Sequence, residues 1–153
     1  MSDAELQQLN MRFHCTQCGC CCRYEEGFVF VSTTDVKRIS QYLKIPRSET
    51  IHQFCRWVPF GTVDHLSLRE QKNRDCVFWQ DGGCGVYPAR PLQCRTYPFW
   101  NHILREPGGW ERESRACPGI GVGRRWSSGE AAAALEQREG NPVMIRRAEG
   151  REG

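Results

Sequence analysis

No run of apolar residues in this chain of 153 approaches the roughly 18 that a membrane-spanning helix needs. The first ten residues, MSDAELQQLN, lack both the basic segment and the apolar segment of a secretory leader, so we expect a cytoplasmic protein. Large apolar side chains are also scarce, because Leu, Ile, Val and Phe together contribute only 30 residues. The hydrophobic core is therefore expected to be thin, and something besides apolar burial must add stability.

Lysine is scarce: the chain has three lysines, compared with 18 arginines. The arginines are scattered along the sequence, so the net charge of +3 gives no reason to expect a nucleic-acid partner. Guanidinium groups can compensate the negative charge of metal-bound thiolates and donate hydrogen bonds to them. We interpret most of the arginine excess as charge compensation and surface.

Cysteine is abundant, with ten residues. Disulfides are rare in the cytoplasm, so this many thiols indicates metal binding. Cys15, Cys18, Cys21 and Cys22 form the pattern C-x2-C-x2-C-C, in which the C-x2-C spacing lets two sulfurs converge on one ion. Cys20 adds another thiol, so the spacing alone leaves the ligand set open. Because neighbouring side chains diverge, we expect Cys21 and Cys22 to serve two sites, or one of them to pack instead.

Four further cysteines follow at longer spacing. Cys76 and Cys84 flank an expected hairpin with its turn at Asp81-Gly82-Gly83, and a hairpin can bring both sulfurs near one point. Cys94 and Cys117 each lie beside a proline-containing segment. Four plus four cysteines would fill two tetrahedral sites.

The identity of the metal stays open between iron–sulfur and zinc, with a slight preference for iron–sulfur. The C-x2-C-x2-C run matches the start of a bacterial ferredoxin motif, although Glu25 stands where that motif has its next cysteine. Cys117-Pro118 could complete a 4Fe-4S cluster from a distance. Zinc accepts four thiolates equally well. Full cysteine ligation suits a structural or electron-transfer role, and the sequence shows no catalytic constellation.

Several segments resemble, in order, the motifs of the CxxCxxCC family, the YkgJ-type cysteine-cluster proteins: Phe13–Cys22, Cys76–Phe78, Cys84–Tyr87, Arg90–Pro98 and Cys117–Gly119. The resemblance implies a zinc- or iron-chelating domain, and some members of that family are called iron–sulfur oxidoreductases. Flagellin lysine N-methylases carry a similar cysteine cluster, which makes a metal-dependent enzyme a further alternative. The ligands that the resemblance implies are Cys15, Cys18, Cys21, Cys22, Cys76, Cys84, Cys94 and Cys117. Cys20 and Cys55 fall outside the shared pattern.

The hydrophobic pattern predicts an α+β fold, a small loop-rich single domain with short hairpins and a few short helices, stapled by cysteine-bound metal. One helix should follow an N-cap near Ser32 and carry apolar residues from Val36 to Leu43. A second hairpin is expected from residues 101–105 and 110–113, around Pro107-Gly108-Gly109.

The predicted domain organisation divides the chain after residue 123. Residues 1–123 should form the cysteine-cluster metal-binding domain, and residues 124–153 a C-terminal helix, over 131–139, and a flexible tail. A protein or redox partner is expected, whereas a nucleic-acid or membrane partner is not. The sequence leaves the oligomeric state open.

Overall fold

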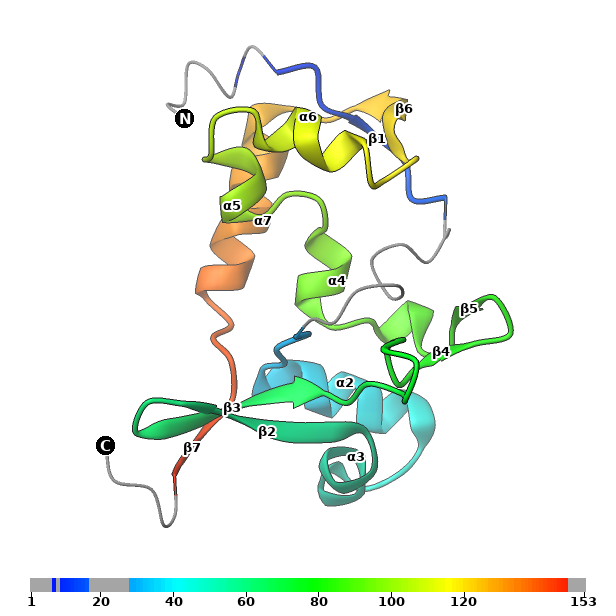
Figure 1. Ribbon diagram of the computed structural model, residues 1–153, viewed down its shortest axis with the longest axis vertical. Helices are drawn as coiled ribbons and strands as arrows, with labels where there is room; N and C mark the ends of the chain where they lie inside the picture. The colour runs from blue at the N-terminus through cyan, green and yellow to red at the C-terminus, as the bar shows by residue number, and fades with distance from the viewer. Residues whose placement is uncertain (1–6, 8, 17–27, 149–153) are drawn as a thin grey trace.

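The computed structural model describes residues 7, 9–16 and 28–148, and its described part mixes helices with small sheets (Figure 1). The helices are α2 (Thr33–Leu43), α3 (Arg47–Phe54), the 3-10 helix η1 (Tyr87–Ala89), α4 (Leu92–Thr96), α5 (Asn101–Leu104), α6 (Gly109–Ser114) and α7 (Ser128–Glu139). The strands are β1 (Arg12–Phe13), β2 (Cys55–Phe60), β3 (Val63–Leu68), β4 (Trp79–Gln80), β5 (Gly83–Cys84), β6 (Ile120–Arg125) and β7 (Ile145–Arg147). This composition confirms the predicted α+β class.

One end of the molecule is built on an antiparallel sheet with strand order β2-β3-β7, next to α2 and α3 (Figure 1). His65 in the central strand pairs with Val58 on one side and Ile145 on the other. Leu66 and Leu68, which alternate along β3, are buried in one cluster with apolar residues of α2. The buried cluster at this end, called the sheet-end core, contains Val31, Val36, Ile39, Cys55, Leu66, Leu68, Phe78 and Val86.

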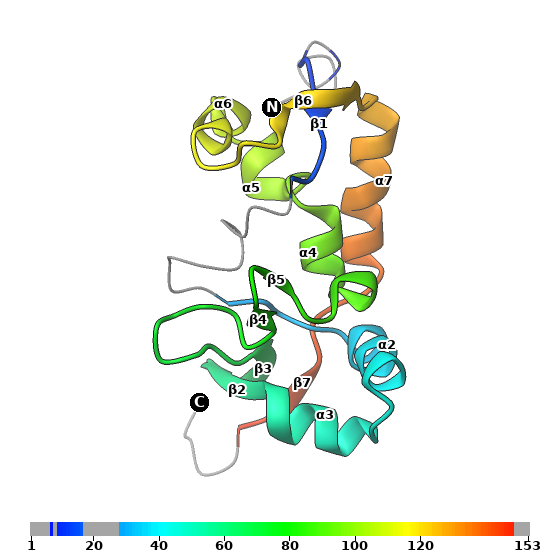
Figure 2. The same ribbon diagram turned by 90° about the vertical axis from the view of Figure 1, so that its right-hand side faces the viewer.

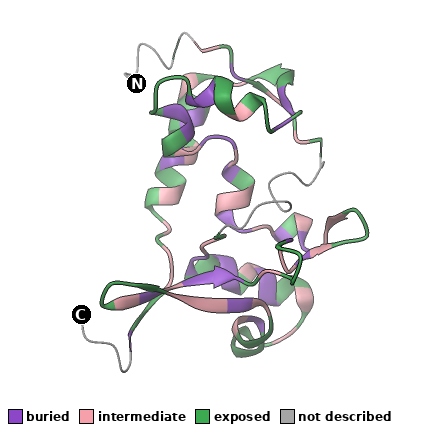
Figure 3. Cartoon of the chain, in the orientation of Figure 1, coloured by how far each residue is buried: buried purple, intermediate pink, exposed green. Residues whose placement is uncertain are grey.

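The opposite end is formed by α5, α6 and the two-stranded ribbon of β1 and β6, while α4 and α7 run between the two ends (Figures 1 and 2). A second buried cluster, the ribbon-end core, contains Met11, Phe99, Ile103, Leu104, Trp110, Cys117, Ile120, Ala131 and Leu135. Colouring by burial shows buried segments at both ends of the chain's long axis (Figure 3). The thin core that composition predicted is therefore divided into two clusters.

The predicted N-cap of α2 is confirmed. Ser32 accepts a hydrogen bond from the Asp35 backbone N–H at 3.1 Å, and the Asp35 carboxylate accepts one from the Ser32 N–H at 2.9 Å. This reciprocal capping box satisfies two donors at the start of the helix. The other carboxylate oxygen of Asp35 accepts the Leu92 N–H at 2.9 Å, so one buried side chain ties α2 to the start of α4.

The second predicted hairpin is wrong, because helices α5 and α6 occupy its two arms. Ile103 and Leu104 are adjacent in sequence and both are 1% exposed, whereas a strand would point them to opposite faces. Gly108 adopts a φ of +72° before α6. Gly109 lies so near α5 that a Cβ there would stand 2.2 Å from the Ile103 carbonyl oxygen. The glycines thus permit a tight helix-to-helix turn rather than a hairpin turn.

The C-terminal part differs from the expected tail. The predicted helix is confirmed as α7, which Ser127 caps, and its Ala131 and Leu135 join the ribbon-end core. Beyond the helix, β7 pairs with the free edge of β3, where tertiary pairing overrides the polar composition. The division after residue 123 stays a prediction. Within the described residues, no helix is long and apolar enough to cross a bilayer.

Candidate metal centre

The structure describes five of the eight predicted ligands, namely Cys15, Cys76, Cys84, Cys94 and Cys117. The other three, Cys18, Cys21 and Cys22, lie outside the described residues. No disulfide joins any two of the described cysteines. Among residues 7, 9–16 and 28–148, no three side chains of His, Cys, Asp or Glu are grouped so that they could hold a metal ion.

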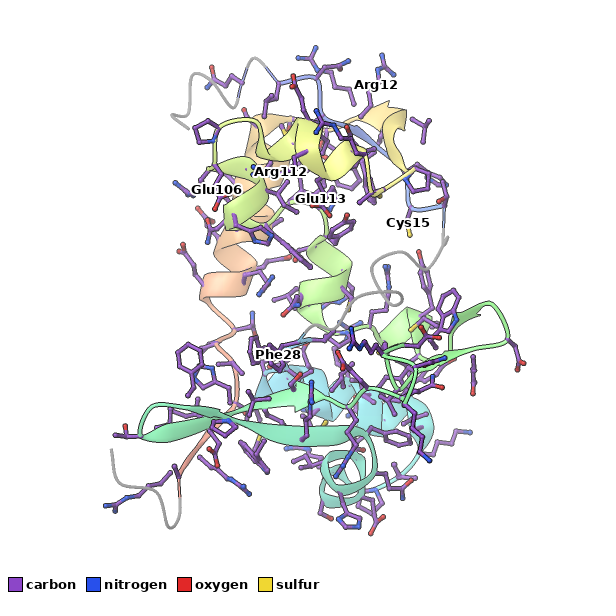
Figure 4. All side chains as sticks on the ribbon, viewed as in Figure 1. Arg12, Cys15, Phe28, Glu106, Arg112 and Glu113 are labelled. Carbon is purple, nitrogen blue, oxygen red and sulfur yellow. The ribbon has the colours of Figure 1, made fainter. Side chains whose placement is uncertain are left out.

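The ribbon of β1 and β6 brings together the chain segments that carry Cys15 and Cys117. The His14 N–H donates a hydrogen bond to the Gly119 carbonyl at 3.0 Å. Cys15 comes one residue after His14 in the sequence, and Cys117 comes two residues before Gly119. A Cβ on Gly119 would stand 2.3 Å from the His14 carbonyl oxygen, so this approach requires glycine. In Figure 4, Cys15 lies past the end of β1.

Cys117 has a polar environment, although it is only 8% exposed. The Tyr97 hydroxyl donates a short hydrogen bond to the Glu113 carboxylate, and the Cys117 N–H donates to the Glu113 carbonyl at 3.0 Å. Burial raises the pKa of Tyr97 far above its usual range, and the hydrogen bond to Glu113 and the neighbouring Cys117 raise it further. The phenol therefore keeps its proton and serves as a hydrogen-bond donor beside this cysteine.

Trp79 links the backbone of Cys76 to that of Cys84. Trp79 pairs with Cys84 across β4 and β5, and its N–H donates to the Cys76 carbonyl at 2.9 Å. The Gln71 side chain donates to the carbonyls of Cys76 and Trp79, at 3.0 and 2.7 Å. The turn has positive φ at Asp81 and Gly82, as the sequence indicated.

Cys94 lies on α4, between the two ends of the molecule. The side chain of its neighbour Gln93 accepts the Phe30 N–H at 3.1 Å and donates to the Phe28 carbonyl at 2.9 Å. These two bonds hold the extended segment that begins at residue 28 against the helix that carries Cys94. The Gln93 carbonyl in turn accepts the Trp100 indole N–H at 2.8 Å.

Cys55, which the resemblance excluded, has a different environment. It is 2% exposed within the sheet-end core, and burial raises its thiol pKa to about 11 against a smaller opposing effect of Arg69. A thiol that resists ionisation in apolar surroundings is a poor metal ligand.

The donor set around the predicted site is rich in sulfur. His14, the imidazole nearest to Cys15 in sequence, is exposed, and both carboxylate oxygens of Asp35 already accept backbone N–H groups. Zinc and iron–sulfur clusters prefer cysteine sulfur as a ligand, whereas calcium and magnesium prefer oxygen, so the candidate cysteines fit the first two.

Sequence reasoning assigned no role to Tyr97, Glu113, Gln93 or Arg138. The position of Tyr97, three residues after Cys94, was a usable signal, because it follows the same short helix. No pattern in the sequence pointed to Glu113 or Arg138, because the packing of α6 and α7 places them near the cysteines.

Comparison with known proteins places these residues in context. The sequence model of the CxxCxxCC family, described as "Putative zinc- or iron-chelating domain", matches residues 14–118. An uncharacterized protein of Methanocaldococcus jannaschii is 32% identical over 89 residues, which cover 57% of this chain and 44% of that relative. The chain thus spans less than half the length of that relative. No solved structure matches the chain.

Proposed function

Because this chain belongs to the CxxCxxCC family of zinc- or iron-chelating domains, we propose that its cysteines hold an iron–sulfur centre. One observation carries the proposal: the matched residues 14–118 begin one residue before Cys15 and end one residue after Cys117, so they take in all eight candidate ligands. The proposed ligands are Cys15, Cys18, Cys21, Cys22, Cys76, Cys84, Cys94 and Cys117.

The proposed role is structural or electron-transferring. Cysteine thiolates would hold the cluster, and a bound cluster supplies one-electron chemistry. The chain's residues would shield and orient the ligands: the aromatic rings of Phe13 and Trp100 pack against Tyr97, which donates its hydroxyl beside Cys117. Metal binding would also contribute to folding, since each of the two apolar clusters is small.

A zinc-binding module is the second candidate. The placement of Cys76 before β4 and of Cys84 at the end of β5 favours it, because a short hairpin can direct two cysteines toward one zinc ion. Four-thiolate zinc sites are structural, so the protein would then act by binding a partner.

The metal and sulfide content of the protein distinguishes the two candidate functions. We would purify the full chain anaerobically and measure iron, zinc and acid-labile sulfide per chain. Iron with an equal amount of sulfide, together with broad visible absorption, is the expected result. Colourless protein with stoichiometric zinc would replace the first candidate with the second, and protein with neither metal would refute both.

A matched pair of variants tests the ligand set. Cys84→Ala should lower the metal content, because Cys84 is a proposed ligand, whereas Cys55→Ala should leave it unchanged. Equal metal loss in both variants would contradict the proposed division of the cysteines.

A further inference from the structure

The outer face of the sheet of β2, β3 and β7, which points away from the sheet-end core, carries exposed apolar side chains. His65 in β3 is paired with Val58 of β2 and Ile145 of β7, and it is adjacent in sequence to the core residue Leu66. Because side chains alternate along a strand and paired residues point the same way, His65, Val58 and Ile145 lie on the outer face. Phe60, two residues after Val58, lies there too. Phe60 is 60% exposed and Ile145 is 55% exposed, so two large apolar side chains on this face are open to solvent.

The chain segment that begins at residue 28 adds two aromatic rings to this face. Phe30 forms a β-bridge with Ser67, which lies two residues after His65 and therefore on the same face. Phe30 stacks on Phe28 with ring centres 5.6 Å apart and meets His65 edge-on at 5.7 Å. Phe60 stacks on His65 at 4.4 Å. We call these four rings the aromatic row, and Phe28, at one end of it beside the sheet (Figure 4), is 46% exposed.

Two arginines lie on the same face as the rings. Arg56 belongs to the outer face of β2, and its guanidinium carbon lies 5.2 Å from the centre of the Phe28 ring. The Arg56 side chain is 34% exposed, and the Glu70 carboxylate stands 3.9 Å from its Nη2, too far for a hydrogen bond. Within the part of the chain that the structure describes, Nε and Nη2 of Arg56 have no hydrogen-bond acceptor. Arg147, at the end of β7, is exposed.

The chemistry of this face matches an anionic partner that has flat rings. Among the residues that β2, β3 and β7 direct to the outer face, the two charged ones are both arginines. In single-stranded nucleic acid, bases stack on aromatic side chains and phosphates pair with guanidinium groups. Sheet faces with exposed aromatic residues bind unpaired bases in this way in RNA-binding domains. A second copy of this chain fits less well, because it would bring arginines close to arginines.

We propose that the outer face of the sheet binds single-stranded nucleic acid, with bases stacked on the aromatic row and phosphates held by Arg56 and Arg147. This inference goes beyond the proposed function, because it uses residues of the sheet rather than the candidate metal ligands. It departs from the expectation drawn from the scattered arginines. The two arginines are far apart in sequence, and strand pairing places both on the face that carries the rings.

The test measures binding of the full chain, as purified, to fluorescein-labelled single strands of DNA and of RNA by fluorescence anisotropy. Strands of about 12 nucleotides suit the site sizes of such proteins. Phe60→Ala should weaken binding by about 5- to 150-fold, the loss expected for one stacked base. Phe60→Tyr keeps a ring and should bind like wild type. Tyr42→Ala removes a side chain that is 47% exposed on α2, and it should leave binding unchanged.

Arg56→Gln tests the phosphate contact. It should weaken binding and reduce the slope of log affinity against log salt concentration by about 0.7, the value for one phosphate contact on a single strand. Arg47→Gln, at an exposed position in α3, removes the same charge and should change neither quantity. Phe28→Ala is the second ring variant, in case circular dichroism shows that Phe60→Ala disturbs the sheet.

Four outcomes would overturn the inference. They are wild type that binds neither strand, a duplex that binds as tightly as the single strands, equal affinities of Phe60→Ala, Phe28→Ala and Tyr42→Ala, and an Asp- and Phe-rich peptide that binds through Phe60 when the single strands do not. The last outcome would identify an acidic protein segment as the partner. Each of them leaves the proposed function intact, because metal content is measured separately on the same protein. Binding of either strand with the expected loss in Phe60→Ala supports the inference, and the tighter of the two strands identifies the sugar that the face accepts.

Discussion

The two hydrophobic clusters each contain a buried cysteine, and the two cysteines differ in the polarity of their surroundings. Cys55 in the sheet-end core is surrounded by apolar side chains, and burial raises its thiol pKa to about 11. Cys117 in the ribbon-end core lies beside the hydroxyl of Tyr97 and the backbone of Glu113. Burial therefore does not separate the proposed ligand Cys117 from Cys55, whereas the polarity of their neighbours does.

The two clusters also differ in how the chain builds them. The sheet-end core uses residues 29–86 together with Met144, whereas the ribbon-end core joins residues near position 11 to residues 97–135. The Cys15 and Cys117 segments meet only because the ends of that long stretch close on each other. Loss of the proposed centre should therefore affect the ribbon end through Cys15 and Cys117, and the sheet end through Cys76 and Cys84, which pack against its core.

The largest expected difference in stability is between two variants, each of which replaces one of the two buried cysteines with alanine. Cys117→Ala should remove metal from its site and destabilise the protein by several kcal/mol, because metal binding contributes folding free energy. Cys55→Ala should cost about 1–2 kcal/mol, since it removes one buried sulfur and leaves a small cavity. Metal analysis and urea unfolding of both variants measure the difference.

A control distinguishes metal loss from a packing defect. Cys117→Ala should unfold like wild type that has been stripped of metal by a chelator. If stripped wild type keeps its full stability, metal does not support the ribbon end, and the comparison between the two cysteines loses its thermodynamic basis.

Sequence reasoning found the features that depend on local chemistry. Three confirmed features follow from side-chain preferences within a few residues. They are the Ser32 cap, the Asp81-Gly82 turn and the helix that ends at Glu139. The expected hairpin around Gly108 failed because its glycines serve a close approach of α5 and α6, and that approach is a tertiary contact.

The candidate site was predictable only as a set of ligand types. The resemblance supplied the eight cysteines, and for Cys55 the environment agrees with its exclusion. The residues that surround the candidates, such as Glu113, Gln93 and Arg138, come from separate elements, so no spacing in the sequence connects them. Which cysteines share a site stays a prediction.

The next largest effect concerns Asp35, which joins the sheet end to α4. Asp35→Ala removes the capping box of α2 and leaves the buried Leu92 N–H without its acceptor. We expect a loss of about 2–4 kcal/mol, combining a lost cap with an unsatisfied donor. Thermal unfolding compared with Glu139→Ala, an exposed position in α7, gives the measurement. A loss no larger than that of the control would show that Asp35 does not connect the two elements.

A smaller effect is the pH dependence of the unfolding free energy that Cys55 causes, which tests how apolar the sheet-end core is. Folding raises the pKa of Cys55 from 9.0 to about 11, so between these values the unfolded chain ionises at Cys55 while the folded chain does not. Stability from this thiol is complete below pH 9 and falls as pH rises, by at most about 1.4 kcal/mol per pH unit. The difference in unfolding free energy between wild type and Cys55→Ala should therefore shrink from pH 8 to pH 10. A difference that does not change with pH would mean that Cys55 is as solvated as an ordinary thiol.

The smallest expected effect is the difference in stability lost when one helix cap is removed from the sheet end or from the ribbon end. Ser32 takes part in a reciprocal capping box at 5% exposure, whereas Ser127 accepts only the Glu130 N–H at the exposed start of α7. Ser32→Ala should cost about 1–2 kcal/mol and Ser127→Ala about 0.5–1 kcal/mol, because a buried cap cannot be replaced by water. Ser→Gly at each position controls for the loss of the hydroxyl, since glycine at an N-cap lets solvent reach the helix donors. If Ser127→Ala proved the more damaging of the two, the start of α7 would be less solvated than its exposure indicates, and the cap at the ribbon end would stabilise its core as strongly as the buried cap at the sheet end.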